Sequence, residues 1–138
     1  LIAGLLDGSI DAVVSSHSPQ DVEGKRMEYD LAEYGMIGLQ TVYPILNEVL
    51  SDKEVPGEKY DELIVDLLSF NPRRILKLPI PEIIEGAKAN LTLFDNKLEW
   101  KLDNTTNRSK SQNSPFWEKN LVGKVIGIYN KGIYLPNE

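Results

Sequence analysis

The feature that most constrains the fold is a change of hydrophobic period near residue 79. Before it, residues 58–70 carry apolar side chains at the spacing of one helix face, namely Tyr60, Leu63, Ile64, Leu67 and Leu68. After it, residues 89–95 and 98–102 alternate apolar and polar side chains, as half-buried β-strands do. The sequence therefore predicts a helical part followed by a small antiparallel sheet.

Four more segments complete the helical part. A short helix is expected at residues 2–7, and the β-branched run IDAVVSS at 10–16 predicts a strand buried on both faces. Residues 17–34 are polar and irregular, which predicts a long loop. Residues 36–50 repeat apolar side chains at helical spacing, with Pro44 expected to kink that helix.

Capping and turn residues divide the rest of the chain. Asn71 followed by Pro72 is typical of a helix N-cap and first helical position. The Asn-Lys pair at 96–97 predicts a hairpin turn. Residues 103–115 read as a polar loop, and residues 121–135 as two strands joined by an Asn-Lys-Gly turn.

The composition excludes several classes of partner. Because the formal net charge is -6, the chain is not expected to bind nucleic-acid phosphates or anionic lipids electrostatically. No stretch approaches the roughly 18 consecutive apolar residues of a membrane span. The absence of cysteine fits a reducing compartment, so we expect a cytoplasmic protein. The sequence begins at Leu1 without a recognisable signal peptide and reads as the middle of a longer protein.

Catalytic zinc is not expected to bind this chain alone. Such sites use about three protein ligands, mostly histidine and cysteine. The chain has one histidine and no cysteine. Its carboxylates show no calcium-loop spacing, and the pairs at 28 and 30 and at 61 and 62 are not spaced for acid–base chemistry.

The lone histidine, His17, lies in the segment AVVSSHSPQD (12–21) at the end of the predicted strand. Active sites of α/β folds gather at the carboxyl ends of parallel strands, so a site is expected here. A serine nucleophile is not indicated, because G-x-S-x-G is absent and adjacent Ser16 and His17 point to opposite faces of an extended chain. The alternative is a strand-to-loop turn capped by serine hydroxyl groups.

Five segments, taken in order, resemble the C-terminal third of dihydroorotases, which are cyclic amidases of the amidohydrolase superfamily. Residues 7–19, DGSIDAVVSSHSP, resemble the last barrel strand of that family, D-G-x-I-D-x-I-x-T-D-H-A-P-H. The other segments are EYGMIGLQT (33–41), NPRRIL (71–76), IIEGAKANLTLFD (83–95) and SKSQNSPFWEKNLVGKV (109–125), which resemble P-F-G-I-x-G-L-E-T, N-P-A-R-I-L, I-x-x-G-x-x-A-D-L-V-L-F-D and S-K-S-x-N-T-P-F-x-G-x-x-L-x-G-x-V, respectively. Together they cover nearly the whole chain.

The resemblance implies a fold in two parts. The family combines a zinc-dependent (β/α)8 barrel with a small β-sandwich built from both chain ends. Residues 1–78 would be the C-terminal end of the barrel, with residues 10–16 as its eighth strand and helices following. Residues 79–138 would be the C-terminal part of the sandwich. A complete barrel takes ~250 residues, so the 138 residues of this chain predict an α/β fragment with an incomplete barrel.

The resemblance also implies site residues. Ser16 stands where the family has its catalytic aspartate, a metal ligand and general base, and serine is poor in both roles. His17 matches the histidine that follows. Gln20 stands where a second histidine contacts substrate. Tyr34 and Gly35 align with the turn whose backbone lines the substrate pocket. We therefore expect His17, Gln20, Tyr34 and Gly35 to be substrate-binding and no residue of this chain to bind metal.

The expected function is that of a C-terminal fragment of a dihydroorotase-like protein of pyrimidine biosynthesis. The resemblance implies that members of the family act on dihydroorotate or a related cyclic amide. We expect this chain alone to be inactive. The family's H-x-H pair, lysine and further metal histidines lie on earlier strands outside this sequence. Two alternatives stay open: a non-catalytic structural partner of aspartate transcarbamoylase, and an active longer amidase of altered substrate. Unpaired strand edges also predict self-association.

Overall fold

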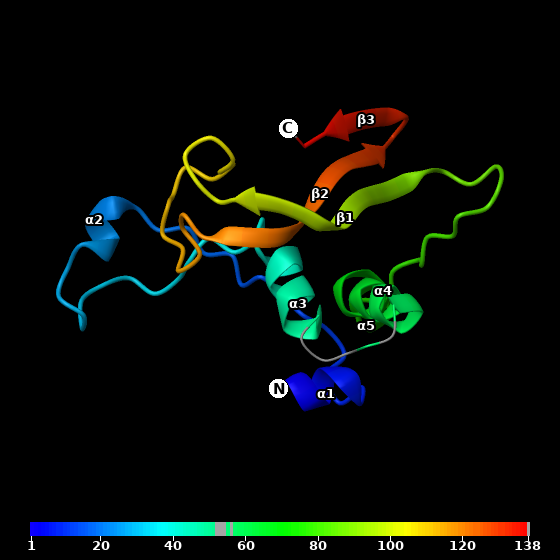
Figure 1. Ribbon diagram of the computed structural model, residues 1–138, viewed down its shortest axis with the longest axis horizontal. Helices are drawn as coiled ribbons and strands as arrows, with labels where there is room; N and C mark the ends of the chain where they lie inside the picture. The colour runs from blue at the N-terminus through cyan, green and yellow to red at the C-terminus, as the bar shows by residue number, and fades with distance from the viewer. Residues whose placement is uncertain (52–54, 56, 138) are drawn as a thin grey trace.

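Helices and strands occupy separate parts of the chain, in the order that the hydrophobic period predicts (Figure 1). The computed structural model describes residues 1–51, 55 and 57–137. The helical elements are α1 (Ile2–Leu6), α2 (Val22–Lys25), α3 (Val42–Ser51), α4 (Gly57–Val65), the π-helical η1 (Asp66–Phe70) and α5 (Asn71–Ile75). The strands are β1 (Asn90–Lys101), β2 (Asn120–Asn130) and β3 (Ile133–Pro136).

The described strands form one antiparallel sheet in the order β1-β2-β3. Strands β2 and β3 are joined by a two-residue turn, since Asn130 pairs with Ile133. Both turn residues have positive φ, 51° at Lys131 and 81° at Gly132, as a type I′ hairpin requires. The turn predicted at this position is therefore confirmed.

The hairpin predicted at 96–97 is wrong, because both residues lie inside the single strand β1. The carboxylate of Asp95 accepts hydrogen bonds from the backbone N–H groups of Lys97 and Leu98 at 2.8 and 3.2 Å. The register with β2 shifts across this stretch, and pairing resumes at Glu99, opposite Val122. A bulge thus interrupts the alternation without reversing the chain, because β2 supplies a partner on both sides of it.

The amphipathic stripe predicted over 58–70 is formed by α4 and η1, in which Tyr60, Ile64 and Leu67 are buried. Asn71 is not a helix N-cap, because η1 leads directly into α5 with helical backbone angles at Phe70 and Asn71. The Asn71 side chain instead donates a 2.9 Å hydrogen bond to the carbonyl of Asp11.

Helix α3 begins at Val42, six residues later than the predicted start at residue 36. Pro44 consequently falls in the first turn, where a missing N–H costs nothing, and the helix continues to Ser51. Figure 1 shows α3, α4 and α5 on one side of the sheet. Buried side chains of α3, α4 and η1 pack there with Phe94 and Val125 of the sheet.

A buried polar residue, Asn47, ties the helices to the sheet. Its Nδ2 donates to the carbonyls of Asn96 and Val122 at 3.1 and 3.0 Å. The hydroxyl of Tyr60 donates to both the side-chain and the backbone oxygen of Asn47. The network joins α3 to α4 and to two strands, so it fixes the helices on the sheet.

The strand predicted at 10–16 is not formed by the described residues. The segment bonds to helical residues instead, from Val13 N to the carbonyl of Leu67 at 3.1 Å and from the Asn71 side chain to the carbonyl of Asp11, and Val14 is 76% exposed. A strand needs a neighbouring strand to complete its ladder, and the described residues place none beside it. An isolated parallel bridge follows, between His17 and Met36.

No helix among the described residues is long and apolar enough to cross a membrane.

Candidate functional site

The predicted site lies on the loop that follows residues 10–16, beside the segment that leads into α3. Ser16 has a φ of 44°, in the left-handed region that is unusual for a serine. The parallel bridge of His17 and Met36 comes directly after it, and Ser18 N donates to the carbonyl of Met36 at 2.9 Å. Two of the segments that carry the resemblance, 7–19 and 33–41, are therefore neighbours in space.

His17 directs one of its ring nitrogens toward the backbone and not toward open solvent. Its Nδ1 accepts hydrogen bonds from the backbone N–H groups of Gly38 and Leu39, at 3.1 and 3.2 Å. The crevice beside the ring, between His17, Gly38 and Leu102, has a volume of about 10 Å³. That volume is close to a single water molecule, so these residues alone leave no space for a substrate there.

The structure brings Gln20 and Tyr34 together. The side-chain Nε2 of Gln20 donates to the carbonyl oxygen of Tyr34 at 3.0 Å. The phenol of Tyr34 is 92% exposed, so in this arrangement Tyr34 contributes through its backbone. The amide nitrogen of Gln20 is thereby engaged within the protein.

Gly35 occupies a position that only glycine tolerates. Its φ is +124°, and a Cβ there would lie 2.6 Å from the carbonyl oxygen of Ser18. The chain passes so close to the 16–20 loop that a side chain has no room. The Gly35 carbonyl accepts a 2.7 Å hydrogen bond from Nδ2 of Asn113.

A third segment, around Asn113, completes the arrangement, and the physical interpretation of 103–115 as a polar loop missed its role. The carbonyl of Asn113 accepts from Ile37 N at 3.0 Å, and Ser111 Oγ donates to the carbonyl of Gln20 at 2.6 Å. The signal that points to it is the resemblance over 109–125. Residues 16–20, 34–39 and 111–113 are thus joined by hydrogen bonds, and we call them the three-segment framework.

These residues do not fit a catalytic zinc ion. Ser16 offers a neutral hydroxyl, and Nδ1 of His17 already accepts two N–H groups. The nearest carboxylate along the chain, Asp21, accepts from Gly24 N at 2.6 Å and caps α2. Across the described parts of the chain, no group of three or more His, Cys, Asp or Glu residues is placed to hold a metal ion.

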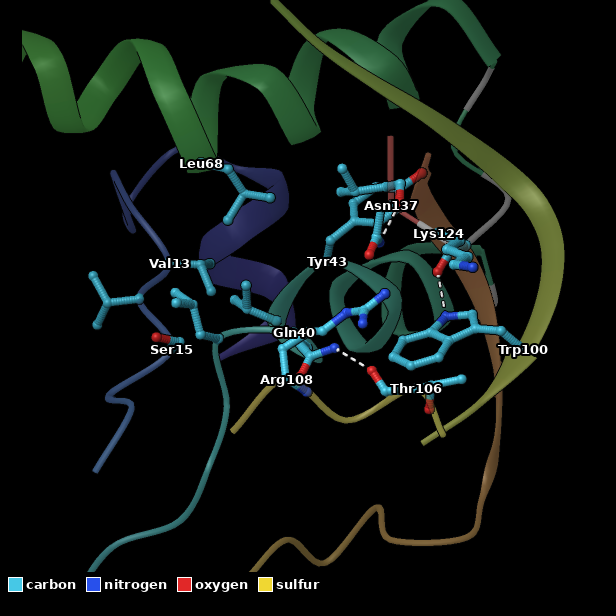
Figure 2. A pocket seen from close by; sticks show the side chains of 15 residues that line it. Val13, Ser15, Gln40, Tyr43, Leu68, Trp100, Thr106, Arg108, Lys124 and Asn137 are labelled. Atoms are coloured by element: carbon cyan, nitrogen blue, oxygen red, sulfur yellow. Dashed lines mark hydrogen bonds between the residues drawn. The ribbon is translucent and has the colours of Figure 1, made fainter. Parts of the chain in front are cut away.

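A larger cavity of about 540 Å³ lies between residues 13–15, α3 and the sheet (Figure 2). Hydrogen bonds from Gln40 Nε2 to Thr106 O (3.0 Å) and from Trp100 Nε1 to Gly123 O (2.8 Å) join residues of its wall. The buried hydroxyl of Tyr43 has no hydrogen-bond partner among the described residues, and burial raises its pKa. None of the predicted site residues lines this cavity, which meets the three-segment framework at Leu39.

Solved structures define the class of fold. L-hydantoinase (dihydropyrimidinase) from Arthrobacter aurescens matches 99% of the chain with a TM-score of 0.82 and 22% identity, and the match covers 31% of that structure. Dihydropyrimidinase from Brevibacillus agri matches 99% of the chain, and 30% of its own, with a TM-score of 0.81 and 20% identity. An inactive dihydroorotase-like domain of the CAD-like multifunctional protein of Chaetomium thermophilum matches 82% of the chain, and 31% of its own, with a TM-score of 0.53 and 16% identity. The chain has the fold of a part of these amidohydrolases.

Sequence relatives then define the group within that class. The chain is 40% identical to the dihydroorotase of Chlorobaculum tepidum over 130 residues, which are 94% of the chain and 29% of that enzyme. It is 39% identical to the dihydroorotase of Elusimicrobium minutum over 122 residues, or 88% of the chain and 27% of that enzyme. No protein-family profile matches. The chain is a relative of dihydroorotases and spans less than a third of their length.

Proposed function

We propose that this chain supplies the C-terminal part of a dihydroorotase-like site without catalysing ring hydrolysis itself. The observation that carries the proposal is Ser16, which stands where the resemblance implies the catalytic aspartate. A serine hydroxyl does not accept a proton near neutral pH, so the general base is missing from this chain.

The neighbouring residues support the same conclusion. Gln20 replaces a histidine of the family motif and carries no positive charge for a substrate carboxylate. Its Nε2 is also engaged with the carbonyl of Tyr34. His17 and Gly35 keep the positions of the family motif, and Gly35 keeps the close approach to Ser18. The framework is therefore retained while the reactive group is replaced.

The proposal assigns the two parts of the chain to different domains. Residues 1–78 would belong to a barrel-like domain that works in the cytoplasm, and residues 79–138 would belong to a separate β-sandwich. In relatives that bind zinc, the ion would be held by residues of earlier strands. Its chemistry would be the activation of a water molecule, which the residues of this chain do not provide.

The experiment is an assay of the purified 138-residue chain with dihydroorotate and added zinc. We expect no turnover above that of buffer, whereas the C. tepidum relative assayed under the same conditions serves as the positive control. Turnover by the chain alone, dependent on protein concentration, would contradict the proposal.

A second candidate function is that of a structural partner of aspartate transcarbamoylase. The fold likeness to an inactive dihydroorotase-like domain of a multifunctional protein favours it. The prediction is co-elution of this chain with aspartate transcarbamoylase at micromolar concentrations. Separate elution at every tested ratio would count against this role.

Self-association is a related expectation. Among the described strands, β1 and β3 each pair only with β2, so each has an outer edge without a partner strand. Val14 and Ile83 are 76% and 87% exposed. Exposed edges and apolar side chains favour pairing between copies, and light scattering should show a mass above 15.5 kDa at high concentration. A monomer at all concentrations would contradict this expectation.

A further inference from the structure

We infer that His17 is a positioning residue that sets the start of helix α3. Its Nδ1 accepts from two consecutive backbone N–H groups, those of Gly38 and Leu39. These groups lie 21 and 22 residues further along the chain, immediately before α3. The inference concerns the fold of the loop and stands whether or not the proposed function is correct.

Gly38 is the point at which the chain enters the helix. Its carbonyl oxygen accepts from Val42 N at 3.0 Å and from Thr41 N at 3.1 Å, so helical hydrogen bonding begins there. The N–H groups at the start of this helical run, including those of Gly38 and Leu39, have no helical partner, as at any helix N-terminus. His17 supplies an acceptor for these two groups from a distant part of the chain, whereas a local Ser, Thr, Asp or Asn cap accepts from N–H groups one or two residues further into the helix.

No side chain on Gly38 can take this role. A Cβ on Gly38 would lie 2.6 Å from the carbonyl oxygen of Ser15, so the position accommodates only glycine. Gly38 is also buried, which makes an unpaired N–H costly. The acceptor must therefore come from elsewhere in the chain, and the bridge of His17 with Met36 places the imidazole there.

The geometry also determines the tautomer of the ring. A neutral imidazole has one acceptor nitrogen and one N–H. Two N–H donors converge on Nδ1, so the lone pair lies at Nδ1 and the proton of the neutral ring at Nε2. His17 is the single histidine of the chain, so its nitrogen resonances can be assigned without ambiguity.

The test uses three variants that differ in where they place an acceptor. His17→Asn puts its Oδ1 two bonds from Cβ, as Nδ1 is, whereas His17→Gln places its oxygen one bond further out, and His17→Ala has no acceptor. We expect amide exchange at Gly38 and Leu39 to accelerate by about tenfold or more in H17A and H17Q. In H17N it should stay within about threefold of the original chain. The amides of Gly127 and Tyr129, in the part of β2 that pairs with both β1 and β3, serve as the internal reference.

The tautomer is measured on the original chain by nitrogen NMR at a pH where the ring is neutral. A protonated Nε2 and an unprotonated Nδ1 are expected. The opposite tautomer would overturn the inference, as would equal exchange in H17N and H17A. If H17A does not fold, the comparison of H17N with H17Q and the tautomer measurement decide the question.

Discussion

The side chain of Asn113 donates a 2.7 Å hydrogen bond to the carbonyl of Gly35, 78 residues earlier in the chain. In return, the carbonyl of Asn113 accepts from Ile37 N at 3.0 Å. This two-way contact holds the 34–39 segment against residues 111–113. A residue of the C-terminal polar loop thus braces the candidate site in the N-terminal half.

Replacing Asn113 by alanine should destabilise the protein. The change removes the donor to Gly35 and leaves that carbonyl without the bond, which should lower the free energy of unfolding by about 1–2 kcal/mol. Urea unfolding measures the difference. The control is Gln112→Ala, whose side chain bonds only the exposed side chain of Asn104, and which should change stability by less than about 0.5 kcal/mol. Equal losses of stability in the two variants would contradict the stabilising role of the Asn113 side chain.

Gly35→Ala should be more damaging than Gly8→Ala. Both glycines have positive φ, but a Cβ on Gly8 meets no atom within 4 Å, whereas one on Gly35 would lie 2.6 Å from Ser18 O. We expect a loss of about 1–2 kcal/mol for Gly8→Ala from backbone strain, and roughly 1–3 kcal/mol more for Gly35→Ala from the clash. Thermal and urea unfolding measure both. Similar losses of stability in the two variants would mean that the 16–20 loop moves aside at little cost, which would contradict the predicted clash.

Asn47→Leu should destabilise the contact between helices and sheet. Leucine has similar size but donates nothing, so the carbonyls of Asn96 and Val122 lose their donor. The hydroxyl of Tyr60 loses the side-chain oxygen of Asn47 and keeps the backbone oxygen of that residue. We expect a loss of about 2–4 kcal/mol. The neighbouring exposed residue provides the control, since Glu48→Ala should stay within about 0.5 kcal/mol of the original chain. A neutral Asn47→Leu would show that the network contributes little.

The hydrogen bonds to Asp103 predict that the stability of the protein depends on pH in the acidic range. Hydrogen bonds from the Thr105 side chain, then from its backbone and from Thr106, lower the pKa of this exposed carboxyl below 3.8. A lowered folded-state pKa stabilises the protein above the unfolded value, and this contribution is lost as the pH falls through the folded value. The stability difference between the original chain and Asp103→Asn should therefore be present at neutral pH and shrink below pH 3.8. A difference that grows on acidification would contradict this.

Local patterns predicted local structure well. The buried stripe of Tyr60, Ile64 and Leu67 follows from helical spacing alone, and the turn at Lys131 and Gly132 follows from its residue types. Features that depend on distant partners were predicted wrongly. The strand at 10–16 lacks a neighbour within the described residues, and the supposed hairpin at 96–97 is a bulge because β2 pairs on both sides of it.

The candidate site shows the same division. The resemblance led to the prediction that Ser16, His17, Gln20, Tyr34 and Gly35 belong together, and hydrogen bonds join their segments. Their roles as substrate ligands stay predictions. The brace by Asn113 and the cap provided by His17 depend on residues 78 and 21 positions away, which no local pattern in one sequence reveals.

The most direct test compares dihydroorotate turnover by the original chain and by Ser16→Asp, each with added zinc and each confirmed as folded. Ser16→Asp introduces the residue that the resemblance implies, but the described residues contain no group of three or more His, Cys, Asp or Glu placed to hold a metal ion. We predict that neither protein exceeds the rate of buffer alone. Turnover by the original chain would contradict the central claim that the framework is kept while its reactive group is lost.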